Sequence, residues 1–195
     1  MTDAATTNGT IDAPPVAVAG SRPYAWPFDG RLTTAGFALA VVTGAGPEGV
    51  SAPDEFAELA SRIRRLGGTV LWIACDGTAL PSDVLPGDLT VMAPTANGFL
   101  GSELDLVLRS NEIDRFAIAG WPFEVAVHST LRRANDLGFE CLVLEDACIP
   151  LESELQDSSI SQILMSGGIF GAVGASSALI AALSNNGLEQ GELPS

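Results

Sequence analysis

The stretch Gly-Trp-Pro-Phe-Glu-Val-Ala-Val-His-Ser-Thr at residues 120–130 joins a strand to a helix and decides the fold of this chain. The apolar run 115–120 leads into it and predicts a buried strand. A helical pattern follows over about 124–137 and stops at Gly138, since glycine commonly ends helices. A further apolar run at 140–144 predicts the next strand. A strand, a helix and a second strand in this order indicate a parallel sheet.

The same alternation extends in both directions along the chain. Further strands are predicted at 37–42, 69–74 and 89–92, and further helices at about 51–66, 101–109, 151–165 and 175–183. We therefore expect one α/β domain over residues 22–184, with flexible tails at 1–21 and 185–195. Its architecture should be three-layer α/β/α with a mainly parallel, Rossmann-like sheet. Ligands of such folds bind beyond the carboxyl ends of the strands.

Composition excludes several classes of function. The chain has no lysine, nine arginines and a net charge of −15, which argues against nucleic acid because phosphate binding needs clustered basic residues. The three cysteines have no metal-ligand spacing, and we expect neither a metal nor a cofactor. No secretory leader or membrane-spanning run is recognisable. The sequence therefore predicts a reduced, cytoplasmic protein.

Several long strings resemble one enzyme family. Residues 120–130, and then 133–147, are similar to the isochorismatase-like cysteine hydrolases, in particular to the branch of biuret and ureidoacrylate amidohydrolases. The resemblance covers residues 22–183, and its further segments are 23–30, 99–109, 167–171 and 177–183. It implies an amide hydrolase in which a cysteine attacks the carbonyl, an aspartate moves protons and a lysine polarises the pair.

The three reactive residues of that family are replaced here. The resemblance puts the cysteine at Ala126 and the aspartate at Thr43, and it puts the lysine at Ala93 or Ala96. Isochorismatase itself works without the cysteine but needs the aspartate. Because Thr43 replaces the aspartate here, the resemblance excludes this mechanism as well. Two connections, 43–53 and 76–89, are shorter than in the amidohydrolase branch, which predicts an open or side-chain-filled site.

Other residues could still give this site a function. Trp121 and Phe123 either form an aromatic binding platform or fill space left by the lost groups. Cys75 could approach the pocket from the end of a strand, whereas Cys141 and Cys148 are expected to be packing residues. The remaining candidates for the pocket are Asn97, Phe99 and Glu124.

The single histidine offers no substitute for the lost residues. His128 lies about 200° around the helix from Ala126, so we expect an orienting or interface role. A triad of Ser129, His128 and Asp146 is excluded, because adjacent helical residues cannot converge on one carbonyl.

These observations predict a catalytically degenerate homologue that acts as a structural or regulatory subunit. The resemblance implies a homo-oligomer, or a hetero-oligomer with a related hydrolase, formed through helix 124–137 and the C-terminal helix. One alternative is a repurposed enzyme that isomerises or cyclises a small molecule, with Thr43, Asn97, Glu124 or Cys75 as polar groups. The other alternative is a small-molecule binding protein without turnover.

Overall fold

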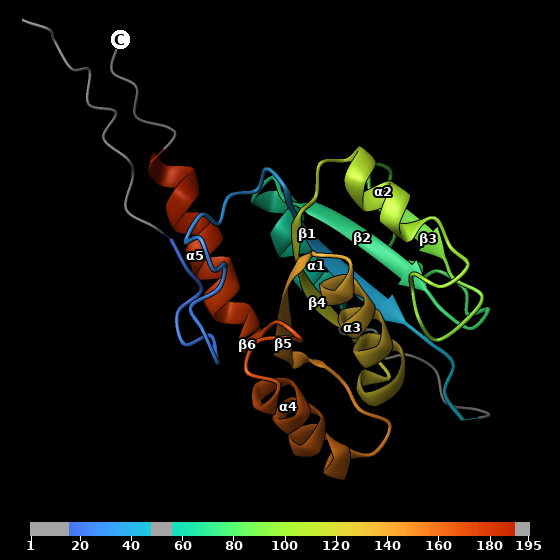
Figure 1. Cartoon of the computed structure of the whole chain (residues 1–195). Helices are drawn as coiled ribbons and strands as arrows, with labels where there is room; N and C mark the ends of the chain where they lie inside the picture. Colours follow the sequence, from blue (N-terminus) through green and yellow to red (C-terminus); the bar gives the residue numbers. More distant parts are fainter. Residues whose placement is uncertain (1–15, 48–55, 190–195) are drawn as a thin grey trace, which may run out of the picture.

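The computed structural model describes residues 16–47 and 56–189, and its centre is a six-stranded parallel sheet (Figure 1). The strand order is β3-β2-β1-β4-β5-β6. The strands are β1 Phe37–Thr43, β2 Thr69–Ala74, β3 Leu89–Met92, β4 Arg115–Trp121, β5 Glu140–Cys148 and β6 Ala172–Gly174. The helices are α1 Phe56–Arg65, α2 Leu104–Ser110, α3 His128–Asp136, α4 Gln156–Met165 and α5 Ser176–Glu189, with a π turn at Phe123–Val127 and a 3₁₀ turn at Ser153–Leu155.

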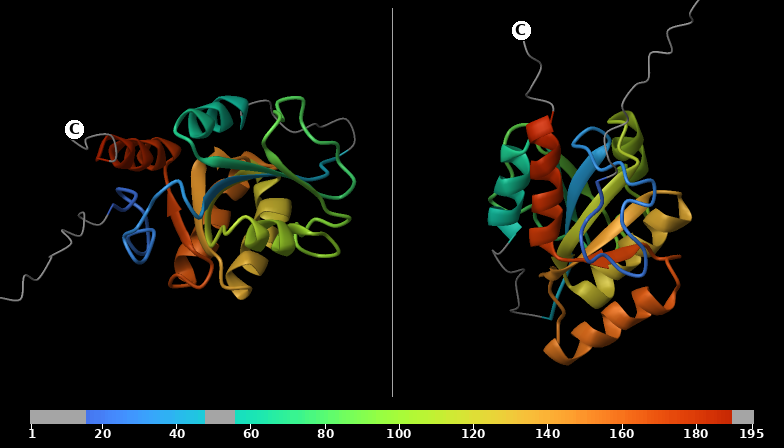
Figure 2. Two further views of the ribbon diagram at one scale, coloured as in Figure 1. Left: turned by 90° about the horizontal axis from the view of Figure 1, so that it is seen from above. Right: turned by 90° about the vertical axis from the view of Figure 1, so that its left-hand side faces the viewer.

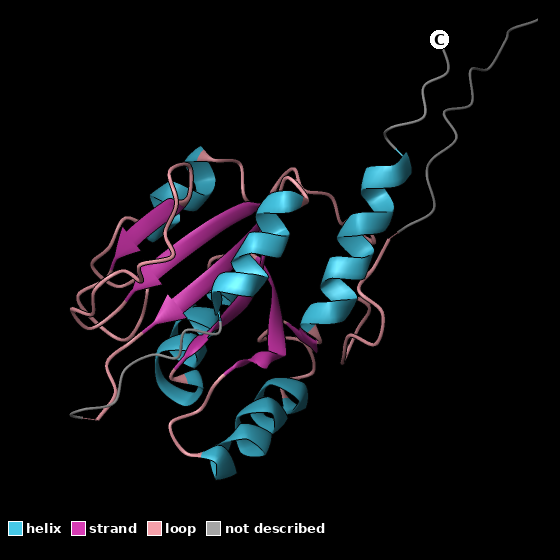
Figure 3. Ribbon diagram, turned by 180° about the vertical axis from the view of Figure 1, so that it is seen from behind, coloured by secondary structure: helices cyan, strands magenta, loops and turns pink. Residues whose placement is uncertain are grey.

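The helices form one layer on each face of the sheet, which confirms the predicted three-layer architecture (Figure 2). Alternate residues of β1 show the division. Ala38, Ala40 and Val42 pack toward α2, α3 and α4, whereas Leu39 and Val41 pack toward α1 and α5. Figure 3, seen from behind, shows that helices cover this second side too. Both faces of β1, β2 and β4 are therefore buried, which explains their continuous apolar runs, whereas the edge strand β3 is buried only at Val91.

The ordered domain begins earlier in the chain than residue 22. Val18 is buried, and its amide donates a 2.7 Å hydrogen bond to the carbonyl of Trp26. Arg22 and Val173 of β6 exchange two backbone hydrogen bonds of 2.9 and 2.7 Å. Residues 16–21 thus belong to the packed domain, while residues 1–15 lie outside the described part. At the other end, α5 continues to Glu189, beyond the predicted helix end at 183.

Two further elements differ from the sequence-based expectation. The strand predicted at 140–144 runs on to Cys148, and a sixth strand, β6, is present that the sequence pattern does not predict. The helix predicted over 124–137 begins as the π turn and becomes α-helical only at His128. The predicted start of the first helix at residue 51 lies outside the described residues.

Asp88 fixes the long connection between β2 and β3. Its carboxylate accepts hydrogen bonds from Arg64 Nε at 2.9 Å and Arg64 Nη2 at 2.6 Å. It also accepts bonds from the indole of Trp72 at 2.8 Å and the amide of Leu85 at 2.9 Å. Burial raises the pKa of Asp88, but these donors outweigh it and hold the pKa below its ordinary value. The connection is thereby tied to α1 and to the sheet.

Candidate functional site

The inherited site lies where β1 and β4 meet at the carboxyl edge of the sheet. This is the switch point of the topology, because the chain moves outward from β1 through β2 to β3, and then from β4 through β5 to β6. The amide of Gly44 donates a 2.8 Å hydrogen bond to the carbonyl of Trp121, so the ends of β1 and β4 stay together. Gly120 allows this approach, since a Cβ there would lie 2.0 Å from the carbonyl oxygen of Val42.

The chain that follows Thr43 and the turn that holds Ala126 pack together at this point. Thr43 is the last residue of β1 and is buried, with its hydroxyl 3.5 Å from the carbonyl oxygen of Ile73. A Cβ on the next residue, Gly44, would lie only 2.6 Å from the Cβ of Ala126. The first turn after β4 therefore packs directly on the chain leaving β1.

Of the two alanines considered for the lysine position, Ala93 is the buried one and directly follows β3. Ala93 is buried in the same apolar cluster as Cys75 and Ala126, and its amide bonds to the carbonyl of Ala74 at 2.8 Å. Ala96 is half-buried in the loop that follows and does not belong to this cluster. Thr43, Ala93 and Ala126 thus stand at the ends of β1, β3 and β4, and none of them carries a charge or a thiol.

Cys75 is the thiol among the site residues predicted from sequence. Burial, and secondarily the carboxylate of Asp76, raises its pKa to about 12, against a smaller opposing effect of a hydrogen bond with Thr130. The hydroxyl of Thr130 also accepts the amide of Gly98 at 2.9 Å. Cys75 is therefore a protonated, packed side chain at neutral pH. Cys141 and Cys148 are buried too, with the pKa of each thiol raised by burial.

Trp121 and Phe123 do not form a shared aromatic platform. The indole of Trp121 packs toward the α1 and α5 layer and lies over Gly46, where a Cβ would be 2.0 Å from the ring. Phe123 is fully buried in the opposite layer, with its ring centroid 5.8 Å from that of His128. The two rings fill space on different faces of the sheet, and the platform interpretation is wrong.

The other proposed pocket residues have structural partners. Both carboxylate oxygens of Glu124 accept the amide of Leu151, at 3.0 and 3.2 Å. The side-chain oxygen of Asn97 accepts the amide of Phe99 at 3.0 Å, and the Phe99 ring packs 5.9 Å from Phe139. These three residues therefore shape loops and core.

His128 holds α3 against α4. Its Nε2 lies 3.3 Å from the carbonyl oxygen of Ser159, and its Nδ1 accepts Arg132 Nε at 3.2 Å. Burial, followed by the nearby charge of Arg132, lowers the pKa of His128 despite the Ser159 bond. The orienting role is consistent with these contacts. Asp146 instead binds the amide and hydroxyl of Ser176, at 2.8 and 2.7 Å, which agrees with the exclusion of a triad.

Asp76 is the site residue that the sequence analysis missed. It is exposed, adopts a φ of 55°, and its Oδ2 is 3.8 Å from the position that a Cβ on Gly44 would take. The only sequence signal was the Asp76-Gly77 pair after a buried strand, which indicates a turn and does not reveal where the carboxylate points. One acid thus lies at the mouth of the inherited site.

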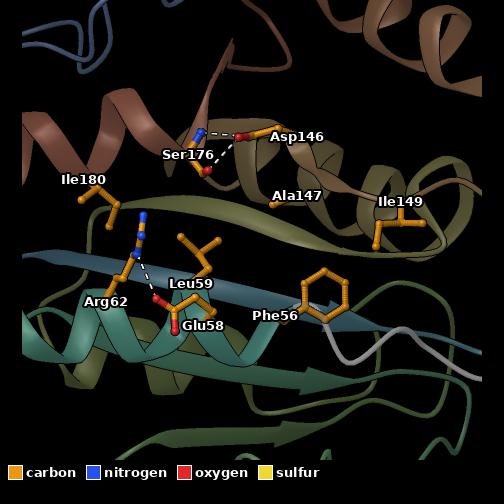
Figure 4. Close-up of a pocket in the computed structure, with 9 residues that line it drawn as sticks. All are labelled: Phe56, Glu58, Leu59, Arg62, Asp146, Ala147, Ile149, Ser176 and Ile180. Carbon is orange, nitrogen blue, oxygen red and sulfur yellow. Dashed lines mark hydrogen bonds and ion pairs between the residues drawn. The ribbon is translucent and has the colours of Figure 1, made fainter.

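A pocket lies between α1, the end of β5 and the start of α5 (Figure 4). Its lining residue Ile149 accepts the amide of Phe123 at 2.8 Å and donates its own amide to the carbonyl of Gly120 at 2.9 Å. Its volume is about 190 Å³. The Glu58–Arg62 ion pair and the Asp146–Ser176 bonds form its polar sides. Its apolar lining is Phe56, Leu59, Ala147, Ile149 and Ile180. None of the pocket residues predicted from sequence lines it.

Comparison with known proteins agrees with this geometry. The model of the isochorismatase domain family matches residues 41–173, and the chain belongs to that family. It is 34% identical over 76 residues to the uncharacterized isochorismatase family protein YecD of Escherichia coli O157:H7, covering 39% of this chain and 40% of the relative. It is 39% identical over 62 residues to the ureidoacrylate amidohydrolase RutB of Azorhizobium caulinodans, covering 32% and 27% respectively. The match therefore spans less than half of either curated relative.

Solved structures share the fold. An isochorismatase family protein from Burkholderia thailandensis superposes with a TM-score of 0.64 at 21% identity, covering 78% of this chain and 97% of its own. A cysteine hydrolase from Pseudomonas syringae pv. phaseolicola gives a TM-score of 0.65 at 16% identity, covering 76% and 92%. At these identities the likeness establishes the fold alone.

Two general properties of the described residues complete the picture. No helix within 16–47 or 56–189 is both long and apolar enough to cross a bilayer. In the same ranges, no three His, Cys, Asp or Glu side chains gather in a way that could hold a metal ion.

Proposed function

We propose that this chain has lost the hydrolytic chemistry of its family and works as a non-catalytic subunit. The observation that supports the proposal is that Thr43, Ala93 and Ala126, the positions matched to the reactive residues of the family, all stand at or after the carboxyl ends of strands and carry neither a charge nor a thiol. The methyl group of Ala126 cannot attack a carbonyl. The hydroxyl of Thr43 cannot accept and return a proton near neutral pH, and Ala93 supplies no positive charge. When catalytic groups act as a unit, removing one of them already removes most of the reaction rate. The loss of all three therefore abolishes hydrolysis.

The neighbouring groups support this proposal. Cys75 follows the end of β2, but its pKa of about 12 keeps the thiol protonated, and only the thiolate is a nucleophile. No arginine of the described residues forms an ion pair with a side chain of the site. The arginines that do form ion pairs use acids elsewhere, namely Glu58, Asp88, Asp105, Asp114, Asp29, Asp136 and Glu145.

Reinstating the three groups tests the proposal. The variant Thr43→Asp, Ala93→Lys, Ala126→Cys should release ammonia from a ureidoacrylate-type amide, whereas the wild type should not. The matched control carries Ala96→Lys in place of Ala93→Lys and should stay inactive, because Ala96 lies outside the buried cluster. Hydrolysis by the wild type contradicts the loss of chemistry. A folded triple variant that gains nothing contradicts the assignment of the positions.

A second candidate function is a small-molecule site built on Asp76, with or without turnover. The observation that favours it is the exposed carboxylate beside Gly44, for which no hydrogen bond or ion pair is found within the described residues. Such a carboxylate would select a cationic ligand, such as a protonated amine or an amidine. Benzamidine is a suitable probe in a titration. Binding that Asp76→Asn abolishes would support this function, and equal affinity for both proteins would exclude it.

A further inference from the structure

The pocket in Figure 4 has the size of a small molecule. Its volume is about 190 Å³, and an apolar cavity of about 150 Å³ already holds one benzene molecule. Its apolar side chains include the buried Phe56 and the half-buried Leu59 and Ile149. In the figure, Phe56 and Ile149 lie toward one end, whereas Arg62 and Ser176 lie toward the other. The pocket thus has an apolar end and a polar end.

Hydrogen bonds hold the walls of the pocket in place. The carboxylate of Asp146, in β5, accepts the amide and the hydroxyl of Ser176 at the start of α5, at 2.8 and 2.7 Å. Ile149 is bonded through its carbonyl to the amide of Phe123 and through its amide to the carbonyl of Gly120. The third wall, α1, packs on the sheet through its buried residues. A ligand would therefore need to order little of the protein, which favours binding.

The α1 wall carries more positive charge than its own carboxylate neutralises. Arg62 Nε lies 3.1 Å from a carboxylate oxygen of Glu58, and Arg65 Nη2 lies 3.5 Å from the same oxygen. The side chains of Arg62 and Glu58 are 53% and 70% exposed, so their pair contributes little to stability. Arg62 can therefore leave Glu58 to Arg65 and bind the carboxylate of a ligand, which suits the geometry of a guanidinium group.

The wall formed by the end of β5 supplies a negative charge. Asp146 forms no ion pair within the described residues, so it does not pair with Arg62 either. Its oxygens accept two bonds from Ser176, but a carboxylate has about four acceptor positions, so capacity remains for another donor. Asp146 comes from β5 and Arg62 from α1, on different walls of the pocket (Figure 4). A ligand that carries both an ammonium group and a carboxylate matches the two.

We infer that this pocket binds an α-amino acid with a branched aliphatic side chain, such as leucine. The carboxylate of the ligand pairs with Arg62, its ammonium group pairs with Asp146, and its side chain lies at the apolar end against Phe56 and Ile149. Charge favours a zwitterion over a simple acid or a simple amine. The field of a chain with a net charge of −15 repels an anion, and an amine leaves Arg62 without a new partner.

Isothermal titration calorimetry of the full chain with L-leucine tests the inference. The wild type should bind leucine saturably. Two analogues each lack one charged group: 4-methylpentanoate has no ammonium group, and 3-methylbutylamine has no carboxylate. Each should bind at least about tenfold more weakly than leucine, because one charge-assisted contact is lost. Absence of saturable leucine binding overturns the inference, and so does an analogue that binds as tightly as leucine.

Variants locate the site. Arg62→Gln should weaken leucine binding by at least about tenfold, and Ala147→Leu should abolish it by filling the pocket. The matched control is Arg109→Gln, which breaks another exposed pair of this spacing on α2 and should leave the affinity unchanged. Asp76→Asn should leave it unchanged too, which separates this site from the carboxylate at the mouth of the inherited site. Unchanged binding by Arg62→Gln, or an equal loss in either control, overturns the inference.

The inference does not depend on the proposed function, because Thr43, Ala93 and Ala126 do not line the pocket. Leucine binding and amide hydrolysis are therefore independent measurements. A chain that binds leucine and also hydrolyses an amide would refute the non-catalytic role only. An inactive chain that does not bind leucine would refute the pocket only.

Discussion

Replacing Asp88 by alanine should destabilise the protein more than any other single loss of an ion pair. The substitution leaves the buried indole N–H of Trp72 without its acceptor, and it leaves Arg64 with only the carbonyl of Asp83 at 3.1 Å. The side chains of Arg64 and Asp88 are 21% and 5% exposed. Breaking a buried pair costs about 3–5 kcal/mol and an unpaired buried donor about 1–3 kcal/mol. Because Arg64 can regain some water, we expect a total loss of about 3 kcal/mol.

Urea unfolding followed by tryptophan fluorescence and circular dichroism measures this loss. The matched control is Asp105→Ala, which breaks the exposed Asp105–Arg109 pair on α2 and should cost less than about 0.5 kcal/mol. The slope of the free energy of unfolding with urea should stay constant, since both proteins expose the same surface on unfolding. If Asp88→Ala costs no more than the control, the network does not hold the connection as argued.

The same carboxylate predicts a pH dependence. The folded-state pKa of Asp88 is lowered, so its contribution is fully present above the unfolded pKa of an aspartate. It should disappear as the pH falls through the folded value, because the unfolded chain then binds the proton first. The stability difference between wild type and Asp88→Ala should therefore shrink in acid. A difference that grows in acid would contradict the sign of the shift.

Three further predictions concern the core around the site. Cys75 should react with a thiol reagent at neutral pH only as fast as the protein unfolds, since its pKa is about 12; rapid labelling of the native protein would refute this. In an NMR titration, the ring of His128 should show a pKa below the ordinary value of histidine, because the ring is buried. Its contribution to stability is then lost as the pH falls through this lowered pKa. A raised pKa would contradict the effect of burial. Gly120→Ala should lower the free energy of unfolding by at least about 2 kcal/mol in calorimetry, because the new methyl group meets the carbonyl of Val42. The control Gly138→Ala has free space for its methyl group and should cost about 1 kcal/mol. Similar losses of stability at both positions would contradict the steric explanation.

Strands buried on both faces could be predicted from sequence because their pattern is local. The run 69–74, for example, coincides with β2. Strand β6 could not be predicted in the same way. Ala172–Gly174 has little strand propensity of its own and is extended because it pairs with β5 on one side and with Arg22 on the other. Those contacts join residues far apart in the chain.

The candidate site shows the same limit. Thr43, Ala93 and Ala126 could be placed at or beyond strand ends from sequence, because the apolar run of each strand is recognisable. It gave no indication that Trp121 and Phe123 face opposite layers. Residues two apart in a strand share a face, but Trp121 ends β4 and Phe123 already belongs to the π turn, where that alternation no longer holds. The position of Asp76 depends on a left-handed backbone that no periodicity reveals.

Side-by-side turnover numbers test the absence of hydrolysis most directly. Ammonia release from ureidoacrylate should be measured for this chain and for a RutB protein under the same conditions, with Cys75→Ala as a second sample of this chain. Our account predicts that both forms of this chain match the buffer blank while RutB is active. Steady release by the wild type that disappears in Cys75→Ala would contradict it, because a protonated and buried thiol would then be the nucleophile.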